Sequence, residues 1–408
     1  MEVLHPRCAG LDVHKDTVVA CVRIAQERGV HRETRTFATH TKDLLSLSAW
    51  LTAHEVTHVA MEATGVYWRP VWHVLESSFE LLLANAMHIK NVPGRKTDVN
   101  DATWIADLLA HGLIQGSFVP PEPVQELRAL TRTRKQLVRE KASHVQRVDK
   151  VLQDANLKLG SVLTDIMGSS GRAILNAIVA GETDPEKLVG LVDPRVKASK
   201  QAIREALCGR ITKNHRFLLE LHLAQIDSID SAVSKIDAEV GESLEPFRAA
   251  ADLVATIPGV SEVAASVIIS EIGADMARFP SAAHLVSWAG LCPRNDQSAG
   301  KHRSTRTRKS APWLKPLLVQ CAWAAGRTKK SYLGAQFRRL KTRRGPKKAI
   351  LAVAASILTA IYHMLNTGQP WSDLGADYFD RADKQKLASR LVRKLGDLGF
   401  QVDVKEAA

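Results

Sequence analysis

Short apolar runs and helical periodicities alternate over the first 115 residues of the chain. The runs CAGLDV and DTVVACVRI are rich in β-forming residues and are separated by the polar pair His14 and Lys15, so they predict adjacent strands. The expected strands span residues 8–13, 16–24, 30–39, 57–63 and 80–86. The expected helices span residues 41–54, with Thr41 as the cap, 66–77 and 98–111. Three strands followed by alternating helices and strands predict a mixed sheet covered by helices, an α/β fold.

A break at the run Phe118-Val119-Pro120-Pro121 ends this first part. Long helical patterns follow at residues 122–159 and 199–244, with a weaker, glycine-containing segment between them. Arg134 and Lys141 interrupt the apolar positions of the first pattern. Two long amphipathic helices predict an antiparallel coiled-coil arm, and the alternative is that they pack onto a globular domain.

The last part of the chain is predicted to be mainly helical. In ATIPGVSEVAASVIISEIG, residues 255–273, a Pro-Gly-Val turn lies between apolar helical segments, the pattern of a helix-hairpin-helix whose backbone N–H groups can meet a phosphate. Further helices are expected at residues 282–289, 313–325 and 346–365, with a loop over 290–310. A mixed tail from residue 370 is expected to pack on the surface. The expected domains are residues 1–118, 119–250, 251–369 and 370–408.

The positive charge of the chain is concentrated in one segment. Between Arg294 and Lys348 there are seventeen Lys or Arg and one acidic residue, whereas the rest of the chain carries thirty-nine basic and forty-two acidic residues. Such a concentration favours duplex nucleic acid as the partner, and the alternative is a solvated basic face. The residues expected to contact nucleic acid are Lys301, Arg303, Arg306, Arg308 and Lys309.

Cysteine usage and hydropathy indicate a cytoplasmic protein. The five cysteines are scattered without a CxxC pair, which argues against a zinc ribbon or a disulfide framework and favours a reducing compartment. The first residues show no signal-peptide pattern. The most apolar stretch, residues 349–365, is shorter than the ~20 residues that span a bilayer, so it predicts a core helix and no membrane contact.

Four acidic residues lie where the elements of the first part end or begin. Asp12 ends one apolar strand, and Glu62 ends another just before a glycine turn. Asp98 and Asp101 are spaced i, i+3 at the start of an expected helix, so they face one side. If the two strands are neighbours, all four carboxylates can converge on one edge of the sheet.

Four converging carboxylates would repel one another, and divalent cations relieve that repulsion. Oxygen ligands and phosphate substrates favour Mg²⁺, with Mn²⁺ as a substitute, and two such ions can activate a nucleophile and stabilise a leaving oxygen at a phosphodiester. Each acid also has a purely structural interpretation. Asp98 can be a helix cap and Asp101 a first-turn acid, whereas Asp12 at the end of an apolar strand is costly to bury without a partner.

Six strings occur together and in order along the chain: GLDVHKDT, MEATGVYW, KTDVNDA, IPGV, WAGLCPRNDQSAG and DLGADYFD. In this combination the chain resembles the DEDD transposases of bacterial insertion sequences, the IS110 group, whose members are bridge-RNA-guided recombinases. The likeness extends over nearly the whole chain and is weakest in the expected arm.

The resemblance implies more than the residues alone. It implies an RNase H-like, RuvC-like first domain in which Asp12, Glu62, Asp98 and Asp101 bind Mg²⁺, and a nucleophilic serine at Ser298. It also implies donor and target DNA as substrates, a structured non-coding guide RNA, a homo-oligomer (a dimer or a tetramer) and a place at the bacterial nucleoid.

A serine hydroxyl that attacks a phosphodiester conserves the bond energy as a phosphoserine, so strands can be resealed without ATP. Ser304 and Ser310 lie in the same segment and are competing candidates. Two other functions stay open. One is a metal-dependent nuclease or junction resolvase in which water attacks, and the other is a non-catalytic DNA-binding protein.

Overall fold

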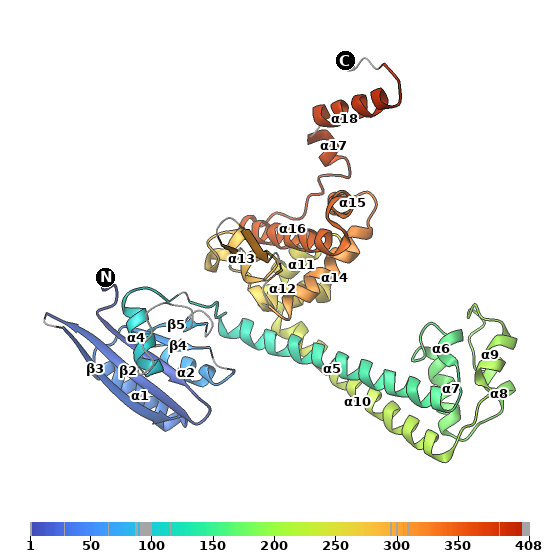
Figure 1. Cartoon of the computed structure of the whole chain (residues 1–408). Helices are drawn as coiled ribbons and strands as arrows, with labels where there is room; N and C mark the ends of the chain where they lie inside the picture. Colours follow the sequence, from blue (N-terminus) through green and yellow to red (C-terminus); the bar gives the residue numbers. More distant parts are fainter. Residues whose placement is uncertain are drawn as a thin grey trace. The chain divides into compact units, whose positions relative to one another are not determined.

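The computed structural model describes residues 2–401 except 28, 64, 86–88, 90–99, 115, 294–295, 299–300, 305, 308–310 and 383 (Figure 1). The chain divides into two compact units, Met1–Val119 and Pro120–Ala408. The finer division of the second unit into an arm, a C-terminal domain and a tail stays a prediction.

The first unit contains a five-stranded mixed sheet in the order β3-β2-β1-β4-β5. Strand β2 runs antiparallel to its two neighbours β1 and β3, and β4 and β5 continue the sheet parallel to β1. The strands are β1 (Arg7–Val13), β2 (Thr17–Gln26), β3 (Gly29–Ala38), β4 (His58–Glu62) and β5 (Glu80–Ala84). The predicted mixed sheet is confirmed, with strand ends shifted by at most two residues.

Helices α1 (Thr41–Ala53) and α2 (Trp68–Leu75) cover one face of this sheet. Leu11, Val18 and Met61 point to that face, because side chains alternate along a strand, and they pack with the buried leucines of α1. The expected cap of α1 is wrong. His40, not Thr41, is the N-cap residue, and its side chain makes no capping hydrogen bond.

Helix α4 (Asp101–Ala110) covers the opposite face and lies directly against the backbone of β1. A Cβ atom at Gly10 would overlap the backbone oxygen of Ala102 and the backbone nitrogen of Ala106. Any larger side chain at this position would therefore push α4 away from the sheet. Glycine here sets how closely the helix approaches the strand.

A buried charged group fixes the far end of α4. Arg23 on β2 is 3% exposed and its Nε donates to Asp107 Oδ1 of α4 at 2.8 Å. Arg32 on β3 donates to the same oxygen at 2.8 Å. A buried guanidinium requires such an acceptor, because an unpaired charge in the interior is costly. The pair ties α4 to two strands of the sheet.

In the second unit, α5 (Glu122–Asp154) and α10 (Lys213–Ser243) lie side by side and run antiparallel (Figure 1). Polar pairs link them: Lys141 bonds Asp230, and farther along α5, Asp154 contacts His215. Between Thr131 and Val148, α5 buries no side chain. The middle of this helix pair thus combines polar contacts with the buried Ile226 and Ile229 of α10, and the coiled-coil packing predicted from the sequence stays a prediction.

The segment between the two long helices folds into four helices with their own core. These are α6 (Leu159–Val162), α7 (Ser169–Val179), α8 (Pro185–Val189) and α9 (Lys200–Leu207). Ile174, Leu188 and Leu207 pack there against Leu152 of α5 and Leu219 of α10. The single helices predicted over 122–159 and 199–244 are wrong in this respect, because each is broken where the chain enters or leaves this core.

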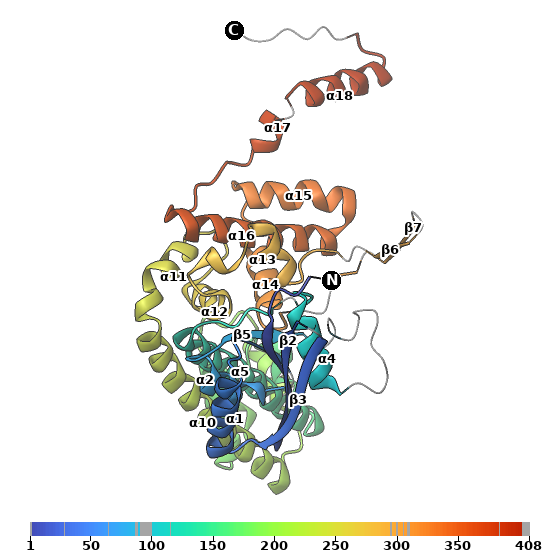
Figure 2. The ribbon, with the colours of Figure 1, turned by 90° about the vertical axis from the view of Figure 1, so that its left-hand side faces the viewer.

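Helices α11 to α16 form the part that follows α10. Their bounds are α11 (Arg248–Ala255), α12 (Glu262–Ile272), α13 (Ala282–Trp288), α14 (Leu314–Arg327), α15 (Tyr332–Arg344) and α16 (Pro346–Thr367). Short 3-10 turns at Glu245–Phe247 and Met276–Arg278 connect them. Helix α15, which lies along α16 in Figure 2, is absent from the prediction.

Helix α16 is the one described helix that is long and apolar enough to cross a membrane by length and composition. Core helices of other proteins meet the same criterion. Here α11, α13, α14 and α15 all pack against α16, and Val353, Ile357 and Ile361 on it are fully buried. This packing agrees with the predicted core helix.

The Pro-Gly-Val turn between α11 and α12 packs against α14. Gly259 has φ +87°, and a Cβ there would lie 2.6 Å from the backbone nitrogen of Ala325 and 2.6 Å from the carbonyl oxygen of Cys321. Glycine is thus required by both backbone conformation and close approach. The helix–turn–helix order is present, and its phosphate contact stays a prediction.

The tail contains α17 (Tyr378–Ala382) and α18 (Lys384–Asp397). Tyr378 and Phe379 pack their rings on Tyr332 of α15. Leu391 and Leu395 on α18 are exposed. The expected packing of the tail on the surface is therefore seen for α17, whereas Leu391 and Leu395 of α18 stay exposed.

Candidate active site

Asp12 and Glu62 lie at the same edge of the sheet. Strands β1 and β4 are parallel neighbours, and the last pair in register is Leu11 with Met61. The two acids are the next residue of each strand. The Asp12 side chain is 17% exposed and Glu62 is half-buried. The carboxyl ends of two adjacent parallel strands thus carry one acid each, as the sequence predicts.

Each of the two acids lies two positions after a strand residue that faces α4. Gly10 lies against α4, and Ala60, its partner in register, belongs to the same buried cluster as Ile105 of α4. Because side chains alternate along a strand, Asp12 and Glu62, each two residues farther on, are on the α4 side as well. The sheet and the helix therefore direct these two carboxylates to one side of one edge.

Asp101 is the first residue of α4, next to Ala102, which lies over Gly10. The N-cap residue is Asn100, whose side-chain oxygen accepts a hydrogen bond from the backbone N–H of Ala102 at 2.9 Å. The predicted start of this helix at residue 98 is therefore wrong. Asp98 itself lies outside the described residues.

No cluster of three or more His, Cys, Asp or Glu side chains close enough to hold a metal ion occurs among the described residues. The donor chemistry nevertheless suits a hard cation, since Asp12, Glu62 and Asp101 offer only carboxylate oxygens. The remaining acid of the predicted set, Asp98, is not described. The fit of the group to Mg²⁺ therefore rests on the type of ligand and on the strand ends that carry Asp12 and Glu62, since the three described acids do not form a metal-binding cluster by themselves.

His14 is a residue of this edge that the sequence analysis did not assign. Its Nε2 lies 3.2 Å from Oδ2 of Asp12, and the ring is more than half exposed. The signal was available, because His14 follows Asp12 by two residues and so extends on the same face. In this position the imidazole can orient the Asp12 carboxylate.

Ser298 lies at the tip of a two-stranded hairpin that the sequence analysis treated as loop. The strands are β6 (Asp296–Ser298) and β7 (Lys301–Ser304), and Ser298 is paired with Lys301. Residues 299 and 300, between the two strands, lie outside the described residues. The backbone of the candidate nucleophile is therefore at the end of β6, paired with a basic residue of β7.

The base of this hairpin is closed by Lys315 of α14. Its Nζ donates to the carbonyl oxygen of Gly290 at 2.8 Å and to the hydroxyl of Thr307 at 2.7 Å. Pro293 and Thr307 also form a β-bridge. Burial lowers the pKa of Lys315 from its usual value. One lysine thus joins the two ends of the segment that carries Ser298. Lys315 and Gly290 are too far apart in the sequence for the sequence pattern to predict this contact.

The predicted nucleic-acid contacts fall partly on this ribbon. Lys301 and Arg306 are exposed, and Arg303 is a residue of β7. Arg308, Lys309 and the competing Ser310 lie outside the described residues. The other competitor, Ser304, accepts a hydrogen bond from the backbone N–H of Arg306 at 3.2 Å through its hydroxyl oxygen.

A second exposed basic surface lies on α15 and the start of α16. It comprises Arg338, Lys341, Arg343, Arg344, Lys347 and Lys348. Within the described part of the chain no ion pair with an acid is found for these six side chains. The basic segment recognised in the sequence is thus divided between the hairpin and this helical surface.

Two family models match the chain. A transposase model of the DEDD type matches residues 9–157, and the model of the IS116/IS110/IS902 family of transposases matches residues 251–338. Together these segments cover more than half of the chain. The first contains all four predicted acids and the second contains Ser298.

Curated relatives of low identity extend the similarity over most of the chain. The pilin gene-inverting protein of Moraxella bovis is 22% identical over 387 residues, which are 89% of this chain and 96% of that protein. The pilin gene-inverting protein of Moraxella lacunata matches to the same extent. An uncharacterized 43.6 kDa protein of the insertion element IS110 of Streptomyces coelicolor is 26% identical over 68% of this chain and 72% of its own length.

Proposed function

Since the chain belongs to the IS110 family of transposases, enzymes that cleave and transfer DNA strands, we propose that it does so with four carboxylates and one serine. The carboxylates are Asp12, Glu62, Asp98 and Asp101, in a first unit with the RNase H-like, RuvC-like fold. The serine is Ser298. The observation that carries the proposal is the pairing of Asp12 and Glu62 at one edge of the sheet, beside the first residue of α4.

The four carboxylates would hold Mg²⁺, for which Mn²⁺ can substitute. When bound, the metal supplies positive charge to the oxygens of the scissile phosphate. The protein's own part is to fix the ligands. Gly10 sets the distance of α4 from β1, the Arg23–Asp107 pair holds the helix in place, and His14 orients Asp12.

Ser298 is the proposed nucleophile. Its hydroxyl oxygen attacks the phosphorus of a DNA phosphodiester and forms a phosphoserine ester, while the bond to the leaving sugar oxygen breaks and that oxygen takes up the proton. In the reverse sense, a DNA hydroxyl attacks the phosphoserine and releases the serine. Lys301, paired with Ser298 across the hairpin, brings positive charge near the phosphate.

The remaining partners belong to the same proposal. We expect donor and target DNA as substrates, a structured non-coding guide RNA, and a homo-oligomer in the bacterial cytoplasm at the nucleoid. The resemblance to the IS110 group supports the RNA and the oligomer. The exposed basic residues of the hairpin and of α15 support the nucleic-acid substrates.

Removal of divalent metal tests the proposal. The purified protein, with the nucleic acid that co-purifies with it, is incubated with circular DNA carrying its own gene and flanking sequence. EDTA should abolish strand cleavage, because it removes the divalent ion through which the four carboxylates are proposed to act. Added Mg²⁺ or Mn²⁺ should restore cleavage, since both ions accept carboxylate oxygen ligands. DNA binding measured by fluorescence anisotropy serves as the control and should survive EDTA. Full cleavage in EDTA would contradict the proposal.

A further inference from the structure

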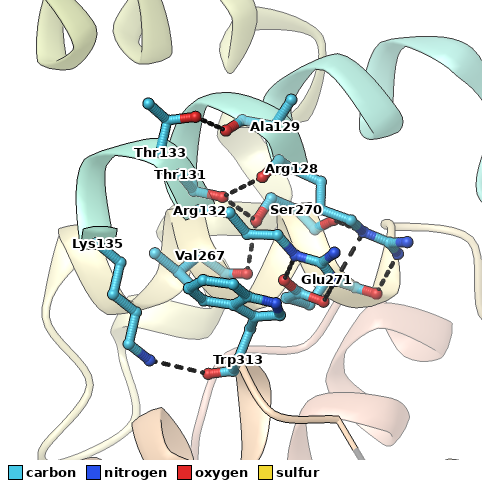
Figure 3. A network of polar contacts seen from close by, with 10 residues as sticks. All are labelled: Arg128, Ala129, Thr131, Arg132, Thr133, Lys135, Val267, Ser270, Glu271 and Trp313. Atoms are coloured by element: carbon cyan, nitrogen blue, oxygen red, sulfur yellow. Dashed lines mark hydrogen bonds and ion pairs between the residues drawn. The ribbon is translucent and has the colours of Figure 1, made fainter. Parts of the chain in front are cut away.

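One face of α5 carries a row of basic side chains next to α12 and Trp313 (Figure 3). Arg128, Arg132, Lys135 and Arg139 are spaced by four, three and four residues, so they lie on the same side of the helix. Other basic residues of α5 face α10, where acids neutralise them: Arg134 pairs with Asp237, and Lys141 with Asp230. On the face toward α12, the positive charges are not matched by an equal number of acidic side chains.

Glu271 of α12 is the acid that this basic row contacts. Its side chain is 3% exposed, and it accepts two hydrogen bonds from Arg132, at 2.7 and 2.8 Å. Arg128 lies 3.8 Å from the same carboxylate and donates to the backbone oxygens of Ser270 and Glu271 at 3.0 and 2.6 Å. One carboxylate therefore serves two guanidinium groups, and these alone leave an excess of positive charge.

Lys135 and Arg139 lie against the ring of Trp313, as Arg132 does, and the ring does not neutralise their charge. Arg132, Lys135 and Arg139 lie 5.5, 5.7 and 5.5 Å from its ring centre. Lys135 also donates to the Trp313 carbonyl oxygen at 3.3 Å. A ring face attracts cations but carries no net charge. Across the described residues, neither Lys135 nor Arg139 forms an ion pair with an acid.

The ionisation of Lys135 agrees with this excess charge. Burial, and then the positive charge of Arg139, lower the pKa of Lys135, and Glu271 offsets this only in part. Lys135 is partly buried and Arg139 is exposed. Neighbouring cations that repel one another gain stability from a bound anion. The cluster of Lys135, Arg139 and the Trp313 ring is therefore suited to an anionic group with several oxygen acceptors.

The cluster lies beside the segment that carries Ser298. Trp313 comes immediately before α14, and two residues later Lys315 closes the base of the β6–β7 hairpin. The carbonyl oxygen that Lys135 contacts thus belongs to the same turn of chain that anchors the hairpin. A DNA strand that reaches the tip of the hairpin brings further phosphates of its backbone along with it.

We propose that Lys135 and Arg139, held against Trp313, bind a backbone phosphate of the DNA that is presented to the Ser298 hairpin. This inference rests on the proposed function, because it takes the DNA near Ser298 as the ligand. Lysine and arginine bind phosphate through charge-assisted hydrogen bonds without reading the base. The two residues are positioning residues that fix the DNA backbone relative to the hairpin.

The double variant Lys135→Gln/Arg139→Gln tests the site in the full-length protein. Affinity for a fluorescent duplex DNA of arbitrary sequence is measured by anisotropy in EDTA over a series of salt concentrations. The slope of log K against log salt becomes shallower by about one for every phosphate contact that is lost, so here it should fall by about one, because both side chains bind the same phosphate. Affinity should fall as well, most strongly at low salt. The charge-conserving Lys135→Arg/Arg139→Lys variant should retain the slope.

The matched control is Arg134→Gln/Lys141→Gln, which removes the same charge from the α10 face of the same helix. It should leave the slope unchanged. An unchanged slope in the first variant, or an equal fall in the control, would overturn the proposal. So would a loss of affinity confined to a structured RNA probe. A lower melting temperature with an intact slope would show that the cluster is only a structural clamp.

The binding assay needs neither metal nor a reactive serine, so it separates this inference from the proposed function. If the slope falls while the wild-type protein never forms a covalent DNA adduct, the phosphate site stands and the serine mechanism fails. If the adduct forms but the slope is unchanged, the serine mechanism stands and the phosphate site at Lys135 and Arg139 fails.

Discussion

Replacement of Ser298 by alanine should abolish the covalent protein–DNA adduct while leaving DNA affinity within about twofold. The hydroxyl is the atom that bonds to phosphorus, so no other change in the chain should remove the adduct as completely. Ser298 ends β6 at the hairpin tip, opposite Lys301, where alanine fits the same backbone. The measurement is a denaturing gel of labelled DNA after incubation with Mg²⁺, with the linked residue identified by mass spectrometry.

Ser304→Ala is the matched control on the second strand of the same hairpin. Its hydroxyl accepts a hydrogen bond from Arg306 N–H, so a small structural effect is expected but the adduct should persist. Two results would count against the serine. One is an adduct on Ser304 or Ser310, and the other is strand cleavage by Ser298→Ala with no adduct in the wild type. The second result would favour a nuclease in which water attacks.

Asp12→Asn and Glu62→Gln should each lower the rate of strand cleavage by about 10³-fold or more. Each change replaces a carboxylate by a neutral amide of the same shape, and the loss of a metal ligand removes several kcal/mol of transition-state stabilisation. The fold should persist, because both side chains lie at an edge of the sheet and not in its core. The rate is measured under single-turnover conditions with saturating DNA.

Asp16→Asn provides the matched control for these variants. Asp16 is exposed in the turn between β1 and β2, four residues after Asp12, and its backbone oxygen bonds Thr39. The same loss of one charge there should leave cleavage within about twofold. Unchanged cleavage in Asp12→Asn and Glu62→Gln would identify these acids as structural. The chain would then act in DNA cleavage without this carboxylate site.

The sheet of the first unit was predictable because its strands are local patterns. β-rich runs such as CAGLDV and VAMEA mark the strands, and their acids mark the strand ends. The order of the strands was not predicted: that β1 and β4 are neighbours was a condition of the sequence argument, and the structure supplies it. What the pattern could not reveal is the role of Gly10, because a glycine in a strand does not say which helix lies against it.

The second unit was less predictable because its packing is not local. Helical periodicity runs through the expected helix 199–244, whereas in the structure the chain turns between Leu207 and Lys213 to close the core of α6 to α9. Helix α15 was missed because its sequence YLGAQFRRLKTRR has few apolar positions, so it shows no clear helical periodicity among its basic residues. Tertiary contacts decide both cases, with the core of α6 to α9 in the first and with α14 and α16 in the second.

The candidate site was predictable only as far as residue type and strand ends allow. Asp12 and Glu62 were placed correctly at one edge, since they are paired through β1 and β4. His14 and Lys315 were missed. The spacing of two residues from Asp12 could have indicated His14, whereas the role of Lys315 depends on a contact across the base of a hairpin that sequence spacing does not display.

The most direct measurement is an anomalous difference map from a crystal of the full-length protein soaked in Mn²⁺. Bound manganese should give a peak at bonding distance from carboxylate oxygens of both Asp12 and Glu62, with Asp98 or Asp101 completing its ligands. The peak should be absent in a crystal of the Asp12→Asn variant. Side chains of these four acids directed to separate places, with no manganese between them in the wild type, would contradict the account.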